Sequence, residues 1–109
     1  MKNKDFQNVY KKGKSHANRY LVMYVLNNET SENRLGISVS KKVGNSVVRH
    51  RITRLIKESY RLQKETFNKG YDIVVVARTS AKEKTYGEIE SALLHLGKLH
   101  SIVDDLSEI

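Results

Sequence analysis

The stretch RLGISVSKKVGNSVVRHRITRLI, residues 34–56, contains two hydrophobic periods that predict two different elements. In residues 35–40, large apolar side chains alternate with small ones, which predicts a strand with one core-facing side and one shallow side. From Val48 onward, apolar residues recur every three or four positions, which predicts an amphipathic helix. Asn45 or Ser46 is expected to be its N-cap. The segment therefore reads as a strand, a turn and a long helix.

Two more helices are predicted, one near each end of the chain. Phe6, Val9 and Tyr10 share one face of a short opening helix. Gly13 is expected to end that helix in the left-handed conformation. The closing helix is expected to begin with a capping box over residues 85–88, which read TYGE.

Two more strands complete the pattern. Residues 20–26 alternate large side chains between two faces, and residues 71–77 are apolar and β-branched without alternation, which is typical of a central strand. The resulting order suggests an α+β or α/β sandwich around a mixed sheet. Strands 35–40 and 71–77 are expected to be parallel neighbours joined by a helix. The local rule for such a unit predicts a right-handed crossover.

Composition restricts the class of protein. The chain has 109 residues, the size of one domain, and carries 20 Lys and Arg against 12 Asp and Glu, a formal net charge of +8. This excess predicts a polyanionic partner, most commonly nucleic acid. The absence of Cys excludes disulfides, thiolate zinc sites and a cysteine nucleophile. Without a membrane helix or a leader, we expect a cytoplasmic, single-domain protein with a disordered tail at about residues 104–109.

The helix that follows the shallow strand is strongly basic. Residues 41–61 contain seven Lys or Arg residues but only one acidic residue, Glu58. A run of charge is often only a solvated face, but such helices usually mix both signs to gain salt bridges. Arginine matches phosphate with two parallel hydrogen bonds, and a helix N-terminus favours anions. We therefore favour binding of a phosphate backbone by Lys41, Lys42, Arg49, Arg51, Arg54, Lys57 and Arg61.

A set of aromatic residues has two interpretations. Phe6, Tyr10, Tyr20 and Tyr24 have the spacing of core residues, which is the commoner role for aromatic side chains at such positions. Beside the small-residue face of residues 36–40, the same rings would form a groove in which an unpaired nucleic-acid strand stacks.

Residues for catalysis by the protein itself are not found. No Ser lies in a nucleophile elbow, and no acidic pair has a spacing that demands acid–base chemistry. No two of the four histidines have the i, i+4 spacing of a helical metal site, and His95 and His100 are expected to be surface or edge-of-core side chains of an amphipathic helix. We therefore predict neither catalytic nor metal-binding residues among His16, His50, His95 and His100.

Residues 34–54 closely resemble the signature of the protein subunit of bacterial ribonuclease P. The resemblance extends upstream to Asp5-Phe6-Gln7-x-x-Tyr10 and Ala17-Asn18-Arg19, and downstream to residues 72–78. A Lys-Lys-x-Gly-Asn turn followed by an Arg-x-Arg helix is the most specific part of this pattern. The sequence departs from the family at His50, where Asn is usual, at Thr53, where a basic residue is usual, and at Ser46, where Ala is usual.

The resemblance implies an α+β fold in αβββαβα order, with a mixed four-stranded sheet like that of the second domain of ribosomal protein S5. It also implies a left-handed crossover, against the local rule. The implied function is that of an RNA-binding subunit in an endoribonuclease, a hydrolase that removes the 5′ leader from precursor tRNA. In that family the RNA subunit holds the catalytic magnesium and performs the hydrolysis, so the protein alone is expected to be inactive.

The resemblance also assigns residues to two RNA surfaces. The catalytic RNA is expected to contact Lys41, Lys42, Asn45, Arg49, His50, Arg51, Arg54, Lys57 and Arg61. The leader is expected to lie in a cleft formed by Phe6, Tyr10, Tyr24, Ser38 and Ser40. One protein is expected to pair with one ribonuclease P RNA, without DNA or membrane partners.

Two other functions remain open from the residues themselves. A ribosomal or general RNA-chaperone protein would use the same basic helix and would bind unrelated structured RNAs equally well. A stand-alone metal nuclease would cleave RNA with magnesium alone.

Overall fold

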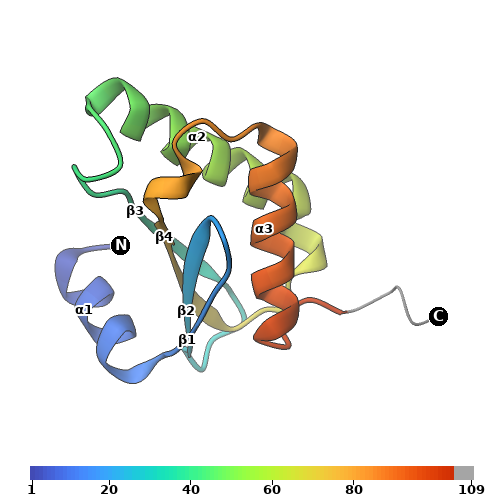
Figure 1. The fold of residues 1–109 in the computed structure, drawn as a ribbon. Coiled ribbons are helices and arrows are strands. Elements are labelled where there is room, and N and C mark those ends of the chain that lie inside the picture. Colours follow the sequence, from blue (N-terminus) through green and yellow to red (C-terminus); the bar gives the residue numbers. More distant parts are fainter. Residues whose placement is uncertain (105–109) are drawn as a thin grey trace.

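The computed structural model describes residues 1–104, which form one α+β domain of three α-helices and a four-stranded sheet (Figure 1). The expected tail at residues 104–109 lies outside this part of the chain, apart from Asp104. The elements in chain order are α1 (Asn3–Lys12), β1 (Lys14–Ala17), β2 (Leu21–Asn27), β3 (Arg34–Ser38), α2 (Ser46–Gln63), the 3₁₀ turn η1 (Lys64–Thr66), β4 (Tyr71–Ala77), the 3₁₀ turn η2 (Thr79–Ala81) and α3 (Tyr86–Leu99).

The strand order is β1-β2-β4-β3, so β4 is a central strand, as its unbroken apolar sequence predicts. β2 pairs antiparallel with both β1 and β4. β3 pairs parallel with β4, and Leu35 lies opposite Ile73 while Ile37 lies opposite Val75. The predicted parallel pair is therefore confirmed.

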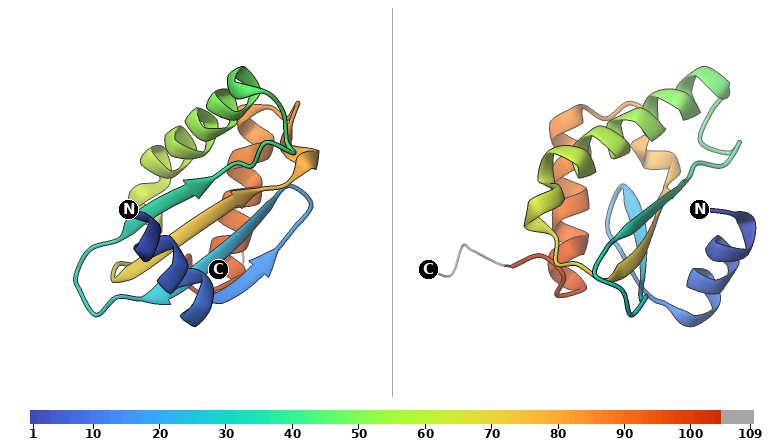
Figure 2. Two further views of the ribbon diagram at one scale, coloured as in Figure 1. Left: turned by 90° about the vertical axis from the view of Figure 1, so that its left-hand side faces the viewer. Right: turned by 180° about the vertical axis from the view of Figure 1, so that it is seen from behind.

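The two faces of the sheet are covered differently. α2 and α3 pack on one face and α1 crosses the other (Figure 2). The main core lies under α2 and α3, where Met23 and Val75 of the sheet are fully buried beside Ile52 and Leu93 of the helices. Successive side chains of a strand point to opposite faces of the sheet, so Val74 points toward the face that α1 covers. It is fully buried there, although it is not part of the main core.

The connection from β3 through α2 to β4 is left-handed (Figure 2), as the family resemblance implies, so the right-handed prediction of the local rule is wrong. That rule describes an isolated strand–helix–strand unit. Here β2 occupies the other edge of β4. The apolar side of β3, with Leu35 and Ile37 packed against the main core, determines which face α2 covers. Burial of the apolar side of β3 therefore outweighs the local preference for a right-handed crossover.

Three details of the sequence-based prediction need correction. The residue pattern did not mark β1, whose four residues are all exposed and carry no hydrophobic signal. β3 ends at Ser38 rather than Ser40. Gly13 has φ −77° and ψ 164°, so it is extended and not left-handed. Glycine is required there because a Cβ would lie 2.6 Å from the backbone oxygen of Val9 and 2.9 Å from that of Val25.

The two predicted helix starts are confirmed. Asn45 is the N-cap of α2, and its side chain accepts a hydrogen bond of 3.0 Å from the Val48 backbone N–H. Thr85 and Glu88 form the capping box of α3. No helix within residues 1–104 is long and apolar enough to cross a membrane.

Candidate RNA-binding surfaces

The first surface is the basic face of α2, together with the turn before it. Ile52 and Ile56 are fully buried and fix the rotation of the helix. The cations consequently lie on its other sides, where Arg49 is half-buried and the rest are exposed. The basic face comprises Lys41, Lys42, Arg49, His50, Arg51, Arg54, Lys57 and Arg61, with Asn45 at the N-terminus of the helix.

Most of this charge is not neutralised within the protein. The salt bridges found in residues 1–104 are those of Arg34 with Asp5 and Asp72 and that of Arg61 with Glu58. The other arginines of the basic face therefore form no ion pair in this part of the chain. A helix whose positive charges lack internal partners retains them for an external anion.

Arg51 makes a contact that the sequence did not predict. Its Nη2 donates a hydrogen bond of 2.8 Å to the backbone oxygen of Lys84, in the segment that leads into α3. The guanidinium keeps further N–H groups, so this contact does not exhaust its capacity to bind phosphate. An open depression of about 630 Å³ lies beside it, lined by Val47, His50, Arg51, Arg54, Leu55, Lys57, Glu58 and Tyr86.

The residues that depart from the family pattern lie on the same helix. His50 is exposed. The Thr53 hydroxyl donates a hydrogen bond of 2.9 Å to the backbone oxygen of Arg49 one turn earlier, so it is directed at the helix backbone.

The second surface is a groove between α1 and the edge strand β3, which we call the α1 groove. It has a volume of about 390 Å³, and none of its lining residues is charged. Two of them are aromatic, and Tyr10 is 39% exposed. The groove is lined by Asn3, Phe6, Gln7, Tyr10, Ile37 and Ser38.

The rings of this surface form a continuous series. The Phe6 and Tyr10 centroids are 6.3 Å apart, and those of Tyr10 and Tyr24 are 4.9 Å apart at an interplanar angle of 75°. Edge-to-face contacts of this kind hold aromatic rings in place. Tyr24 therefore supports Tyr10 from below rather than lining the groove itself.

The structure unites only part of the predicted leader cleft. Phe6, Tyr10 and Ser38 line the α1 groove, whereas Ser40 lies beyond the end of β3 and does not. The sequence prediction missed Asn3 and Gln7, although their spacing of three and seven residues from Tyr10 places all three on one side of a helix.

Tyr20 belongs to neither surface. Its hydroxyl donates a hydrogen bond of 3.3 Å to Glu88, and the Lys84 ammonium lies 5.2 Å from the centroid of its ring. These contacts connect the start of β2 with the N-terminal half of α3.

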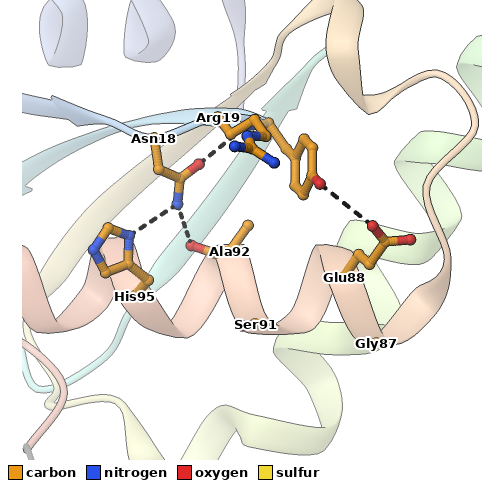
Figure 3. Close-up of a pocket in the computed structure, with 8 residues that line it drawn as sticks. Asn18, Arg19, Gly87, Glu88, Ser91, Ala92 and His95 are labelled. Carbon is orange, nitrogen blue, oxygen red and sulfur yellow. Dashed lines mark hydrogen bonds between the residues drawn. The ribbon is translucent and has the colours of Figure 1, made fainter.

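A third depression, of about 410 Å³, lies where the β1–β2 connection meets α3 (Figure 3). Asn18 uses both ends of its amide there. Its Oδ1 accepts hydrogen bonds from the backbone N–H groups of Tyr20 and Leu21, and its Nδ2 donates to the Ala92 backbone oxygen at 2.9 Å and contacts His95 Nδ1 at 3.2 Å. Because these groups are satisfied internally, Asn18 joins the sheet to α3.

No group of three or more His, Asp or Glu side chains in residues 1–104 could hold a metal ion. His95 is exposed and His100 is half-buried, as expected for surface and edge-of-core residues. The rings of His16 and His100 contact each other at a centroid distance of 4.6 Å. Burial lowers the pKa of His100 below its usual value. The hydrogen bond to the Met23 backbone oxygen acts in the opposite direction but has a smaller effect.

The protein thus carries a basic helix with few internal ion pairs and, separately, an uncharged groove lined by aromatic rings. The model of the ribonuclease P family matches residues 1–100. The chain belongs to the ribonuclease P protein family. It is thus the protein subunit of a ribonucleoprotein endoribonuclease, its partner is ribonuclease P RNA, and it assists the maturation of the 5′ end of precursor tRNA.

Individual ribonuclease P proteins show how close the relationship is. The chain is 70% identical over 98 residues to the ribonuclease P protein component of Lachnoclostridium phytofermentans, covering 90% of this chain and 84% of that protein. It is 59% identical over 95 residues to that of Alkaliphilus metalliredigens, covering 87% and 86%.

Solved structures agree with the fold. The ribonuclease P protein of Staphylococcus aureus superposes with a TM-score of 0.87 at 46% identity, covering 95% of each chain. The Thermotoga maritima protein, solved with a fluorophenyl thiourea, gives 0.82 at 35% identity, covering 86% of this chain and 92% of that one.

Proposed function

We propose that this ribonuclease P protein binds two RNAs on two separate surfaces. The basic face of α2 holds the ribonuclease P RNA, and the α1 groove holds the 5′ leader of precursor tRNA. The observation that carries the proposal is the contrast between the two surfaces: one is cationic with few internal ion pairs, and the other is aromatic and uncharged.

The basic face suits a folded RNA with closely spaced phosphates. Its arginines offer planar pairs of N–H donors, and the N-terminus of α2 adds exposed backbone N–H groups near Asn45. No acidic residue lies in the first turn of α2, so nothing there repels a phosphate. Binding through such contacts is expected to weaken steeply as salt concentration rises.

The α1 groove suits an unpaired strand. A lining without charged residues offers little to phosphates but can receive the faces of bases. Base–ring stacking is worth ~1–3 kcal/mol per base and is tolerant of sequence. Mature tRNA has no leader and cannot use this groove, so the groove distinguishes substrate from product.

Magnesium belongs to the RNA subunit in this proposal. RNA-bound magnesium would supply the Lewis-acid chemistry of phosphodiester hydrolysis. The contribution of the chain is to bind and orient the two RNAs, as one protein on one RNA in the cytoplasm.

Reconstitution with a bacterial ribonuclease P RNA tests the proposal. At low magnesium, the protein is expected to raise the rate of leader removal and the affinity for precursor over mature tRNA, and to cleave nothing without the RNA. Competition with unrelated structured RNAs is the control. Equal affinity for all of them would favour a general RNA chaperone, and cleavage by protein and magnesium alone would favour a metal nuclease.

A further inference from the structure

The Phe6 ring, which lines the α1 groove, lies over Gly36 of β3. Gly36 is a buried residue of β3. A Cβ at this position would lie 2.7 Å from Phe6 Cζ, 2.8 Å from Phe6 Cε1 and 2.8 Å from Met1 Sδ. These distances are shorter than van der Waals contact, so the ring occupies space that is available only because residue 36 has no side chain.

The backbone itself does not require glycine here. Gly70 is the one glycine with positive φ among residues 1–104, so Gly36 has a conformation open to other residues. Glycine inside a strand weakens it and often marks a place where another group approaches the backbone closely. At Gly36 that group is the Phe6 ring.

The depth of this ring determines the shape of the α1 groove. Phe6 is half-buried against the sheet, while Tyr10, one helical turn later, stays 39% exposed. Phe6 also lines the groove together with Ile37 and Ser38, the two residues that follow Gly36. A ring raised from the strand would enter the space between α1 and β3.

We propose that Gly36 is a positioning residue for leader binding: it lets Phe6 lie directly on β3 and so keeps the α1 groove open. This inference rests on the proposed function of the groove. It assigns to Gly36 no contact with RNA, because Phe6 and Met1 cover it.

The proposal predicts a loss of function without a loss of the fold. The atoms that an added methyl group would meet belong to the side chains of Phe6 and Met1 and not to the backbone, so we expect these side chains to move aside. The basic face of α2 belongs to the helix layer on the opposite face of the sheet (Figure 2), so it is expected to be unaffected.

The test compares Gly36→Ala with Gly87→Ala in the reconstituted holoenzyme. Gly87 is the matched control, since a Cβ there meets nothing within 4 Å. The quantity measured is the ratio of the dissociation constants for mature and precursor tRNA. Gly36→Ala is expected to lower this ratio at least ~5-fold, the lower end of one base–ring stack, while affinity for the ribonuclease P RNA stays unchanged. Gly87→Ala is expected to change neither.

A double-mutant cycle shows whether the effect passes through Phe6. In a Phe6→Leu background, Gly36→Ala is expected to have little further effect on the ratio, because the ring that it displaces is absent. Additive losses would overturn the proposal. So would a fall in Tm of more than about 8 °C for Gly36→Ala, since the side chains would then have failed to move aside.

The two proposals fail in different ways. If Phe6→Leu leaves the ratio at the wild-type value, the leader does not use the groove and the proposed function is wrong. If Phe6→Leu lowers the ratio but Gly36→Ala does not, only the role of Gly36 is wrong.

Discussion

The guanidinium of Arg34 binds the carboxylate of Asp72 through two hydrogen bonds, from Nε to Oδ1 at 2.9 Å and from Nη2 to Oδ2 at 2.6 Å. Asp72 is only 3% exposed, and Asn28 donates a further hydrogen bond of 3.0 Å to its Oδ1. Arg34 Nη2 also lies 3.5 Å from Asp5 Oδ1. The group therefore links β3, β4 and α1.

Removal of the Arg34 side chain is expected to destabilise the protein. Arg34→Ala leaves the Asp72 carboxylate buried with Asn28 as its remaining side-chain donor. We expect the free energy of unfolding to fall by about 2 kcal/mol, less than for a fully buried pair because Arg34 is half-exposed. Urea denaturation at pH 7 measures this. Arg61→Ala is the control, since its pair with Glu58 is exposed to solvent and is expected to contribute less to stability.

The same pair predicts how stability depends on pH. The hydrogen bonds from Arg34 are the main reason that the pKa of Asp72 lies below its usual value near 3.8. Below pH 3.8 the unfolded chain binds the proton first, so stability is lost as pH falls toward the lower pKa of the folded state. Arg34→Ala is expected to flatten this part of the stability curve. If Arg34→Ala lost stability below pH 3.8 in the same way as the wild type, the Arg34–Asp72 pair would not be the cause of this pH dependence.

Arg54 offers a direct test of the basic face. It is exposed and forms no ion pair within residues 1–104. Arg54→Ala is expected to weaken binding to ribonuclease P RNA and to reduce the salt dependence by ~0.7–0.9 in the log–log slope, the value for one phosphate contact. Filter binding over a range of salt concentrations gives both quantities. A parallel shift with an unchanged slope would mean that Arg54 does not contact phosphate.

Arg51→Ala is expected to weaken binding to the same RNA, with an additional structural effect. Because Arg51 also donates to the Lys84 backbone oxygen, its loss releases the segment before α3. Faster hydrogen exchange of the amides in residues 82–85 is expected for Arg51→Ala and not for Arg54→Ala. Equal exchange in the two variants would show that the contact with Lys84 does not hold this segment.

The Tyr10 and Tyr24 rings are expected to affect precursor binding alone. Tyr10→Ala removes an exposed ring of the α1 groove, and Tyr24→Ala removes the ring that supports it at 4.9 Å. Both variants are expected to lower affinity for precursor tRNA, Tyr10→Ala by ~1–3 kcal/mol. Tyr10→Phe retains the ring and is expected to bind like the wild type. A loss shared equally by mature and precursor tRNA would show that the rings do not hold the leader.

Asn18 is expected to stabilise the fold without binding RNA. Asn18→Ala leaves the backbone N–H groups of Tyr20 and Leu21 and the Ala92 oxygen without their partner, at an expected cost of ~1–3 kcal/mol. Asn18→Asp keeps the acceptor oxygen and is expected to cost less. Thermal unfolding compares the two variants. Unchanged binding to ribonuclease P RNA, measured well below the melting temperature, separates this role from a contact with RNA.

The amino-acid sequence by itself determined the parts of the protein that depend on local pattern. Hydrophobic period and capping residues located the three helices and three of the four strands, and unpaired charge identified the basic helix. β1 carries no such pattern, because its exposed residues are held in place by pairing with β2. The crossover hand likewise followed only from the family resemblance, because it depends on which face of the finished sheet is buried.

Only the tertiary structure decided how the α1 groove is built. Its lining comes from α1 and β3, while Tyr24 of β2 supports the Tyr10 ring, and the packing of α1 on the sheet brings these separate segments together. The same packing excluded Ser40 and Tyr20 from the groove and added Asn3 and Gln7. It also placed Gly36 under Phe6, because the distance between a ring and a strand depends on how two elements pack and not on the residue types of either one.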